Sequence, residues 1–304
     1  MVTSLAEWIQ SLEGTEAGAR LATILALSAA LLHAIFGALQ KGRHDPWLSR
    51  GAIDAWLFLL SAPIALFAVP WPAGGEWLIL AGAMIIHFTY KVGMALAYSR
   101  GAFTVVYPVV RGSGPLFTVF GAWLIFGETF SAIQWLGVLV LVTGIFGLAV
   151  YNLIHVEIDR ETLVPALWLA LATGATVALY TTYDAFGIRT TPDPFTFLAW
   201  FFFLTAMDMP VIAALRWRNL RFRPPPWPLA WRGLAGAFVA WGSFGSVMLA
   251  TRLDKVGEAA VLRETSTVFA ALIGWLVLRE SVGPRRLALM CTIALGAVIV
   301  ELGG

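Results

Sequence analysis

A small set of ionisable side chains lies inside long apolar runs of the sequence, and these residues are the ones able to do chemistry. They are Lys91, Arg111, Asp208, Arg263 and Glu264, joined by His33, His87 and Asp184. A charged side chain near the centre of a bilayer costs about 2.5–3.5 kcal/mol on insertion scales. Such residues are kept where they face a partner, a ligand or a cavity, so this set predicts a binding site within a membrane.

Two arginines are the first candidates for contact with a ligand. When Arg111 is aligned with Arg263, Val110-Arg111-Gly112-Ser113 faces Leu262-Arg263-Glu264-Thr265, so the two arginines occupy related positions. A planar guanidinium group can bind a carboxylate or phosphate through two parallel hydrogen bonds. The alternative is that each arginine is permanently paired with an acid, Arg263 with Asp184 or Asp208, and only holds helices together.

Spacing along the helices limits which side chains act together. Glu264 directly follows Arg263, so on a helix the two point about 100° apart and cannot face one spot. His87 and Lys91 are four residues apart and share one helix face. A lysine beside an arginine loses its proton more readily because like charges repel, which suits a proton-exchanging group. The alternative is an ammonium group hydrogen-bonded to an acid or to helix carbonyls.

The remaining candidates are aromatic or lie nearer the helix ends. Tyr180 and Asp184, also four residues apart, are placed to hydrogen-bond each other or to line an entrance. Trp241 offers an aromatic face for a flat or cationic ligand, although such a residue is more often core or lipid-facing. Glu128 and Glu280 are expected to cap connections or pair with arginines. Lys91, Arg111 and Arg263 outnumber Asp208 and Glu264 by one positive charge, and counting Asp184 brings the sum to zero, so the balance favours an anionic or zwitterionic ligand.

The composition requires a membrane around these residues. Of 304 residues, 59% are hydrophobic and 12% are charged, and the mean hydropathy is +0.80. A soluble domain carries about 25% charged residues. The net charge of +2 gives no indication of nucleic-acid binding. The single cysteine, Cys291, cannot form an internal disulfide, and the histidines have no metal-ligand spacing, so we expect no metal and no cofactor.

Ten apolar runs are long enough to cross a bilayer, for which about 20 residues are needed. They predict an all-α polytopic membrane protein with ten transmembrane helices. Residues 1–19 precede them and predict a short interfacial helix around Trp8. The runs are 21–40, 52–70, 77–98, 102–126, 132–152, 164–186, 195–215, 230–250, 257–278 and 285–302.

The alignment of Arg111 with Arg263 extends over three helices of each half, which indicates an internal repeat. We predict a first repeat over 20–155 and a second over 156–304. Because five helices are an odd number, the second copy enters from the opposite side, which makes an inverted repeat around a central cavity. Pro63 and Pro210 fall at matching places and are expected to act as gating hinges or to give passive curvature. Gly112-Ser113-Gly114 is expected to loosen its helix.

Basic residues gather in the connections after the odd-numbered runs, for example at Lys41, Arg43, Arg160 and Arg216 to Arg223. Connections rich in lysine and arginine stay in the cytoplasm. This distribution predicts that both termini lie outside.

Two segments that end in glutamate, Ala102 to Glu128 and Gly257 to Glu280, resemble the EamA family of the drug/metabolite transporter superfamily. Each begins with small residues, has an aromatic residue near its middle and is followed by a glycine-rich helix. The resemblance covers essentially the whole chain. It implies a helical basket with a central cavity, a carrier activity and no cofactor, but no single substrate, and family custom places the termini in the cytoplasm, against the charge distribution.

Two further stretches resemble a branch found beside phosphonate-utilisation genes. They are His33-Ala34-x-x-x-Ala38-x-x-Lys41 and Tyr180-Thr181-x-x-Asp184-x-x-Gly187-x-Arg189. That branch usually has Trp-Asn where this chain has Phe36-Gly37, so the chain departs from the pattern there. The resemblance points to an organophosphorus cargo, which remains one alternative beside an amino acid.

The sequence therefore predicts a secondary carrier in a bacterial inner membrane, working by alternating access, with export favoured over uptake. Its expected partners are the lipid bilayer, a small polar metabolite and protons as coupling ion, exchanged at Asp208 or Glu264. No nucleic acid is expected, and a homodimer is left open. The alternative is a flippase for a lipid-linked headgroup. An enzyme is disfavoured because no nucleophile–base pair or phosphate-binding loop is present, and a channel because the charges form no repeated rings.

Overall fold

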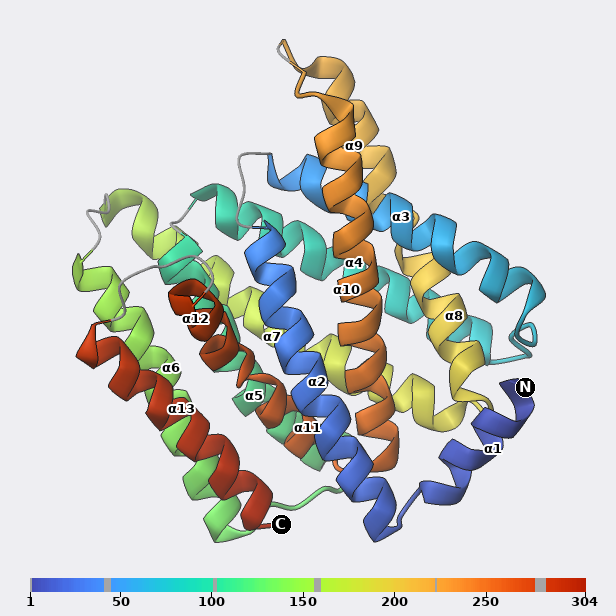
Figure 1. The fold of residues 1–304 in the computed structure, drawn as a ribbon, viewed down its shortest axis with the longest axis horizontal. Coiled ribbons are helices and arrows are strands. Elements are labelled where there is room, and N and C mark those ends of the chain that lie inside the picture. The colour runs from blue at the N-terminus through green and yellow to red at the C-terminus, as the bar shows by residue number, and fades with distance from the viewer. Residues whose placement is uncertain (1, 41–44, 101–102, 156–159, 222, 277–282) are drawn as a thin grey trace.

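The computed structural model describes residues 2–40, 45–100, 103–155, 160–221, 223–276 and 283–304. Over these ranges the chain is almost entirely helical and has no strand. Figure 1 labels the helices. They are α1 (Val2–Leu12), α2 (Glu16–Gln40), α3 (Pro46–Phe67), α4 (Glu76–Arg100), α5 (Phe103–Phe126), α6 (Ala132–His155), α7 (Arg160–Thr190), α8 (Pro194–Thr205), α9 (Asp208–Asn219), α10 (Pro226–Leu253), α11 (Val256–Arg263), α12 (Ser266–Leu276) and α13 (Pro284–Leu302).

Eight helical segments in the described ranges are long and apolar enough to cross a membrane. They are α2 to α7, the pair α8–α9 taken together, and α10. Residues Leu287–Leu302 of α13 form a shorter apolar helix. The prediction of an all-helical, multi-pass membrane protein is therefore confirmed, while the two runs nearest the C-terminus are shorter helices than expected.

The run expected as one helix over 195–215 is broken into α8 and α9, so that prediction was wrong in this detail. The break covers Ala206 and Met207. Pro210 explains it, because proline has no N–H to donate to the carbonyl four residues earlier and its ring clashes there. Asp208 begins α9 and its carboxylate accepts the Met209 N–H at 2.5 Å. Pro63, by contrast, lies on the exposed side of an unbroken α3.

The run expected over 257–278 is also broken, between α11 and α12 at Glu264 and Thr265. Here the Thr265 and Thr267 hydroxyls donate to the carbonyls of Leu262 and Glu264, at 2.7 and 2.9 Å. Such local bonds compete with the helical ladder. α5 runs without interruption through Gly112-Ser113-Gly114, so the loosening expected there is not accompanied by a break and stays a prediction.

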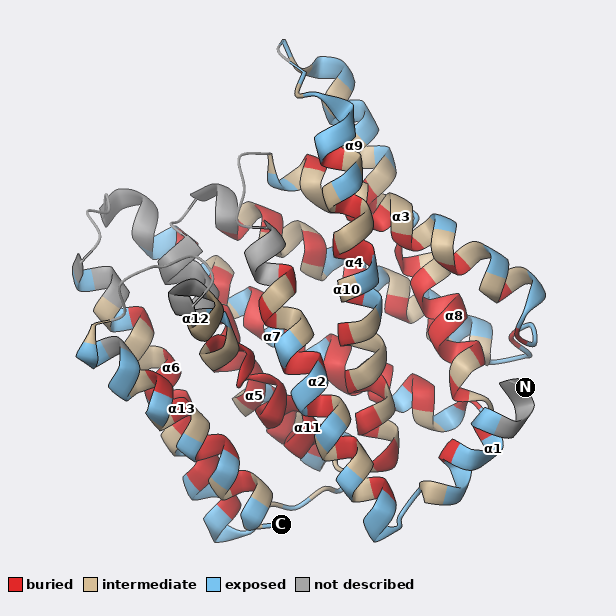
Figure 2. Cartoon of the chain, viewed as in Figure 1, coloured by how far each residue is buried: buried red, intermediate tan, exposed pale blue. Residues whose placement is uncertain are grey.

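The helices pack in pairs that join distant parts of the chain. α2 packs against α10, α11 and α12, whereas α7 packs against α4 and α5. α3 lies against α8, α9 and α10, and α6 lies beside α13 (Figure 1). Buried residues are concentrated in α5, α8 and α11, and every residue of α11 is buried (Figure 2). The interior is therefore built from segments of both halves.

The N-terminal helix α1 has one buried and one exposed side. Ala6 and Ile9 are buried, while Leu5 and Trp8 are exposed. The helix packs on α2 and α8. This amphipathic helix contains Trp8, as expected, but it ends at Leu12, and α2 already begins at Glu16 within the segment 1–19. Its position at a membrane surface remains a prediction.

The contact between α6 and α13 depends on glycine. A Cβ atom added at Gly296 would lie 2.4 Å from the Leu141 nitrogen and 2.7 Å from the Gly137 carbonyl oxygen. These are backbone atoms, which cannot move aside without separating the two helices.

We predict that Gly296→Ala lowers the free energy of unfolding by at least about 1 kcal/mol, because overpacking at this level strains the backbone. The measurement is unfolding in detergent followed by circular dichroism. Gly75→Ala is the control, since nothing lies within 4 Å of its added Cβ. Equal stability of the two variants would show that the close helix contact is not needed.

Candidate functional site

Buried charged side chains form two groups at the centre of the helices. The lysine cluster consists of Arg50, Asp54, Lys91 and Asp208. The arginine cluster consists of Arg111, Glu264 and Arg263, with Asp184, His87 and Tyr180 beside it. Each group contains residues from both halves of the chain.

Lys91 is held by oxygen atoms from three helices. Its Nζ donates to Asp54 Oδ2 of α3 at 2.7 Å, to Asp208 Oδ1 of α9 at 2.8 Å, and to the Thr205 carbonyl at the end of α8. The Asp54 side chain is fully buried, and its Oδ1 lies 2.9 Å from Arg50 Nε. The α8–α9 break supplies both Thr205 and Asp208, because its residues do not continue the helical ladder.

This geometry favours one of the alternatives that the sequence left open. Lys91 bonds to two acids and a carbonyl, and one of these acids, Asp54, also contacts Arg50. The sequence did not single out Arg50 and Asp54, since Arg50 falls in a connection and Asp54 lies close to the start of the apolar run 52–70. Their spacing of four residues, typical of a helical ion pair, was the available signal.

Arg111 and Glu264 form a buried ion pair between the halves. Arg111 Nε of α5 lies 2.8 Å from Glu264 Oε2, and Nη2 donates to Ser266 Oγ at 3.1 Å. Both side chains are almost completely buried. Glu264 lies in the α11–α12 break, which turns its carboxylate toward α5. Of the two roles considered for Arg111, pairing with an acid is the one observed.

Arg263 differs from Arg111 although the two align in sequence. It is 4% exposed, yet it makes no ion pair within the described residues, and its Nε has no hydrogen-bond partner there. Its guanidinium lies over the Tyr180 ring, 6.0 Å from the centroid. The expected partners are occupied elsewhere, Asp208 by Lys91 and Asp184 by His87. As expected, Arg263 and Glu264 contact different helices.

His87 and Asp184 connect α4 to α7. His87 Nε2 lies 2.8 Å from Asp184 Oδ2, and the imidazole packs on Tyr180 with ring centroids 4.7 Å apart. Asp184 Oδ1 is buried without a hydrogen-bond partner. Asp184 therefore bonds to His87 and not to Tyr180, the partner considered from the sequence.

Two predicted site residues lie at the edge of this arrangement. His33 packs between Phe36 and Phe244, with ring centroids 6.1 and 6.4 Å away. Trp241 is 42% exposed and packs on Phe202, so it faces outward and away from both clusters. The ligand contact expected of Trp241 is therefore not supported, because this residue lies on the outer face of α10.

Two small cavities lie between the clusters. The first, about 20 Å³, is lined by residues that include Asp54, His87 and Lys91. The second, about 10 Å³, is lined by residues that include Asp184 and Arg263. Phe244 lines both. Each has room for about one water molecule, so neither of these two cavities has room for a metabolite.

The charges of the two clusters balance. With histidine neutral, four carboxylates face four basic groups: Asp54, Asp184, Asp208 and Glu264 against Arg50, Lys91, Arg111 and Arg263. Burying an uncompensated charge costs several kcal/mol. The described residues hold no group of three metal-ligating side chains.

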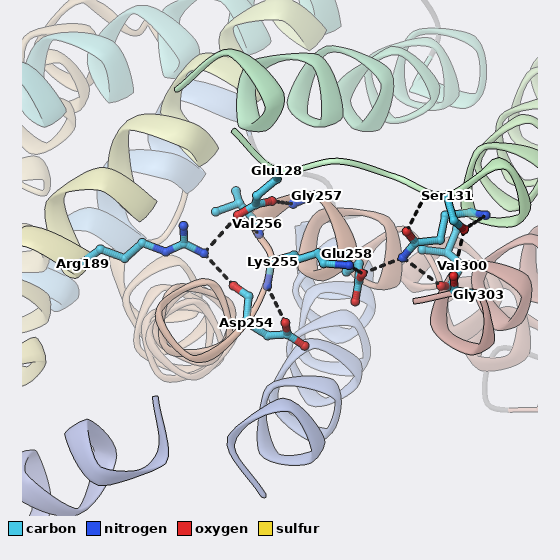
Figure 3. Close-up of polar contacts among 11 residues, drawn as sticks. Glu128, Ser131, Arg189, Asp254, Lys255, Val256, Gly257, Glu258, Val300 and Gly303 are labelled. Atoms are coloured by element: carbon cyan, nitrogen blue, oxygen red, sulfur yellow. Dashed lines mark hydrogen bonds and ion pairs between the residues drawn. The ribbon is translucent and has the colours of Figure 1, made fainter. Parts of the chain in front are cut away.

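One end of the molecule is closed by a polar network that we call the junction. Its residues are Glu13, Glu128, Arg189 and Arg252, with the α10–α11 turn at 254–257. Figure 3 shows Glu128 reaching the first turn of α11, where its carboxylate accepts the Val256 and Gly257 N–H groups at 2.9 and 3.1 Å. The capping role expected for Glu128 is confirmed, and Glu280 lies outside the described residues.

The two arginines of the junction cap each other's helices. Arg189, in the last turn of α7, donates to the Thr251 and Asp254 carbonyls, both at 2.7 Å, and pairs with Glu128 at 3.1 Å. Arg252, in the last turn of α10, donates to carbonyls at the end of α7 and pairs with Glu13 at 2.6 Å. These contacts hold α7, α10 and α1 together at one end.

The arrangement defines a class, a helical membrane protein that encloses a balanced set of charges. A solved structure titled only "Crystal structure of protein" has the same fold, with a TM-score of 0.75 and 18% identity over 92% of this chain and 96% of that chain. Among curated proteins no sequence matches.

The second half of the chain is similar to a known family. Residues 164–302 match the model of the EamA-like transporter family. This is the family that the sequence resembles, so the resemblance has the support of a family model over that part of the chain.

For the lysine cluster we predict that Lys91→Met lowers the free energy of unfolding by about 3–5 kcal/mol, because it leaves buried acids without their cation. Asp208→Asn should cost clearly less, since the Asp208 side chain is 20% exposed and asparagine still accepts from Lys91. Unfolding in mixed detergent checks both. A loss of unfolding free energy in Lys91→Met that is smaller than the loss in Asp208→Asn would contradict the assignment of Lys91 as the central ion.

Proposed function

We propose that the protein is a secondary carrier of a small polar metabolite, working by alternating access between two inverted repeats over 20–155 and 156–304. In this proposal α11–α12 is the ninth span and α13 the tenth. Paired helix contacts support it: α2 with α10 corresponds to α7 with α4, and α5 with α7 corresponds to α11 and α12 with α2. Two further contacts, α6 with α13 and α3 with α8–α9, each join a helix to its own counterpart in the other repeat.

The observation that carries the proposal is the set of polar contacts between the halves. The ion pairs Arg111–Glu264 and Lys91–Asp208 and the hydrogen bond His87–Asp184 each join a residue of the first repeat to one of the second. A protein held rigidly could use apolar contacts at these places at no loss of stability. Charged groups, in contrast, can exchange one charged partner for another when a cargo binds, and this exchange is a reason for charges at these places.

The cavities and the junction support an alternating mechanism. The centre holds about one water at each cavity, so the helices must separate to admit a metabolite. At the junction, Arg189 and Arg252 close one end, and opening there would break several charge-assisted hydrogen bonds. We propose the α8–α9 break before Pro210 as one hinge of this motion; Pro63, in an unbroken helix, would give passive curvature.

The cargo, direction and location follow the charges. We propose an anionic or zwitterionic cargo, either an amino acid or an organophosphorus compound, exported across a bacterial inner membrane. Protons are the proposed coupling ions, exchanged at Asp208 or Glu264. By the distribution of basic loops the junction would be on the outer side.

Purified protein in liposomes tests the proposal. We expect concentrative uptake of a water-soluble cargo from a panel of amino acids, phosphonates and sugar phosphates, and a loss of at least about tenfold in Arg111→Gln and Arg263→Gln, because hydrogen bonds to charged groups contribute about 1.5–3 kcal/mol. The control is Arg20→Gln, whose side chain is 75% exposed. Normal transport by both Arg111→Gln and Arg263→Gln would contradict the proposal. Movement of labelled lipid alone, as in a flippase, would also contradict it.

A second prediction concerns opening at the junction. In a Cys291→Ser background, Val247→Cys places one thiol in the wall of the smaller cavity. Adding Arg252→Gln should raise the rate of labelling by a maleimide in detergent by about tenfold, because lost charged hydrogen bonds favour the open population. Adding Arg20→Gln should leave the rate unchanged. No change with Arg252→Gln would show that the junction is not a gate.

A further inference from the structure

The end of α9, the start of α10 and their connection carry a dense group of arginines, which we call the arginine hairpin (residues 216–232). Its five arginines are Arg216, Arg218, Arg221, Arg223 and Arg232. The first four are exposed and the last is half-buried. From Met209 to Thr251 the sequence contains no aspartate, glutamate or lysine. The tip of this hairpin projects beyond the other helices in Figure 1, and Figure 2 shows most of it exposed.

The lengths of the two helices bring the hairpin to a membrane surface. α10 has 28 residues and is therefore about 42 Å long, whereas the hydrocarbon core of a bilayer is about 30 Å thick. α9 begins at Asp208, which bonds to Lys91 in the interior, and Arg216 lies about 12 Å further along this helix. The junction is at the other end of α10. We therefore expect the arginines at the level of the lipid headgroups, on the surface opposite the junction.

Exposed apolar side chains accompany the arginines. Trp227 and Trp231 are four residues apart at the start of α10, so they share one face of the helix, and both are exposed. Val211 and Leu215 of α9 have the same spacing and are also exposed. Indole rings favour the boundary between headgroups and hydrocarbon. The hairpin thus offers apolar contact to lipid tails beside guanidinium groups for lipid headgroups.

Three consecutive prolines stiffen the connection between the helices. The ring of Pro224, Pro225 and Pro226 fixes the φ angle of each residue. Pro225 is extended, with φ −57° and ψ 131°, and α10 begins at the next residue. A stiff connection loses little conformational entropy when a ligand binds, which favours binding.

The hairpin differs from the junction in how its charge is balanced. At the junction Arg189 pairs with Glu128, and Arg252 pairs with Glu13. In the hairpin Arg216 pairs with Asp45 at 2.6 Å, while the hairpin itself supplies no acid. A guanidinium fork matches the oxygens of a phosphate group. Basic clusters next to a transmembrane helix attract anionic lipids.

We propose that the arginine hairpin is a binding surface for anionic phospholipids. The phosphate groups accept hydrogen bonds from the guanidinium groups, and Trp227 and Trp231 lie against the upper part of the acyl chains. The bound lipid holds the outer end of α9, whose inner end carries Asp208. The binding needs no cargo, so its test does not depend on the proposed carrier function.

The first test measures binding of tritiated phosphatidylglycerol to the purified full-length protein in a neutral detergent by scintillation proximity. We expect phosphatidylcholine with the same acyl chains to compete at least about tenfold more weakly than unlabelled phosphatidylglycerol, because basic side chains near the surface attract only the anionic headgroup. Raising the salt concentration from about 0.1 M to about 1 M should weaken binding, since screening shortens the range of the attraction. Equal competition by the two lipids overturns the proposal.

Inorganic phosphate distinguishes a lipid from a small anion as the source of the phosphate group. At the concentration at which unlabelled phosphatidylglycerol displaces the label, inorganic phosphate should displace none, because it has no acyl chains to contact the tryptophans. Displacement by inorganic phosphate equal to that by the lipid overturns the assignment of a lipid.

The second test locates the binding with pairs of exposed arginines. Arg218→Gln together with Arg223→Gln should lower the affinity for phosphatidylglycerol by at least about tenfold, because each arginine contributes separately to the attraction. Arg20→Gln together with Arg285→Gln removes the same charge from exposed positions outside the hairpin and should leave the affinity nearly unchanged. Equal losses in the two pairs, or no loss in the first, overturn the assignment of the hairpin.

A lysine pair separates lost charge from lost structure. Arg218→Lys together with Arg223→Lys keeps the charge, so it should lose less affinity than the glutamine pair, and circular dichroism should show the same helix content for all variants. A lysine pair that binds as weakly as the glutamine pair overturns charge as the cause of binding.

Discussion

Everything at the centre of this protein depends on the cost of burying charge. A lone ion in a medium of low dielectric costs several kcal/mol, so the eight charged groups there are retained only as a balanced set. Asp54, fully buried, requires Lys91 and Arg50. Glu264 requires Arg111. Because these pairs join helices far apart in the chain, charge balance also determines which helices meet.

The two helix breaks make this arrangement possible. An unbroken helix uses its carbonyls internally and projects neighbouring side chains about 100° apart. At the α8–α9 break the Thr205 carbonyl and the Asp208 carboxylate both reach Lys91. At the α11–α12 break Glu264 reaches Arg111 while Arg263 reaches Tyr180. Non-helical backbone is tolerated within a membrane protein where it lines such an interior site. The breaks therefore place polar groups where uninterrupted helices could not.

The sequence predicted much of the fold because the positions and lengths of hydrophobic runs are visible directly in the order of the residues. It also singled out Arg111, Arg263, Lys91 and Glu264, since a charge inside an apolar run is conspicuous. It could not predict which acid each base contacts, because partners such as Lys91 and Asp208 are 117 residues apart. It treated Arg111 and Arg263 as equivalent, but one is paired and the other is open. That difference arises from the α11–α12 break, for which no proline or glycine gave a signal.

The claim that the two halves move about this charged centre is tested most directly by a distance between them at the junction. Thr129 and Thr190 are exposed residues at that end, one on the α5–α6 connection and one at the end of α7. With Cys291 replaced by serine, spin labels at both positions would report their separation by double electron–electron resonance. The account predicts two distance populations whose proportions shift when a solute that the protein carries in liposomes is added. A single distance distribution that no solute changes would contradict it.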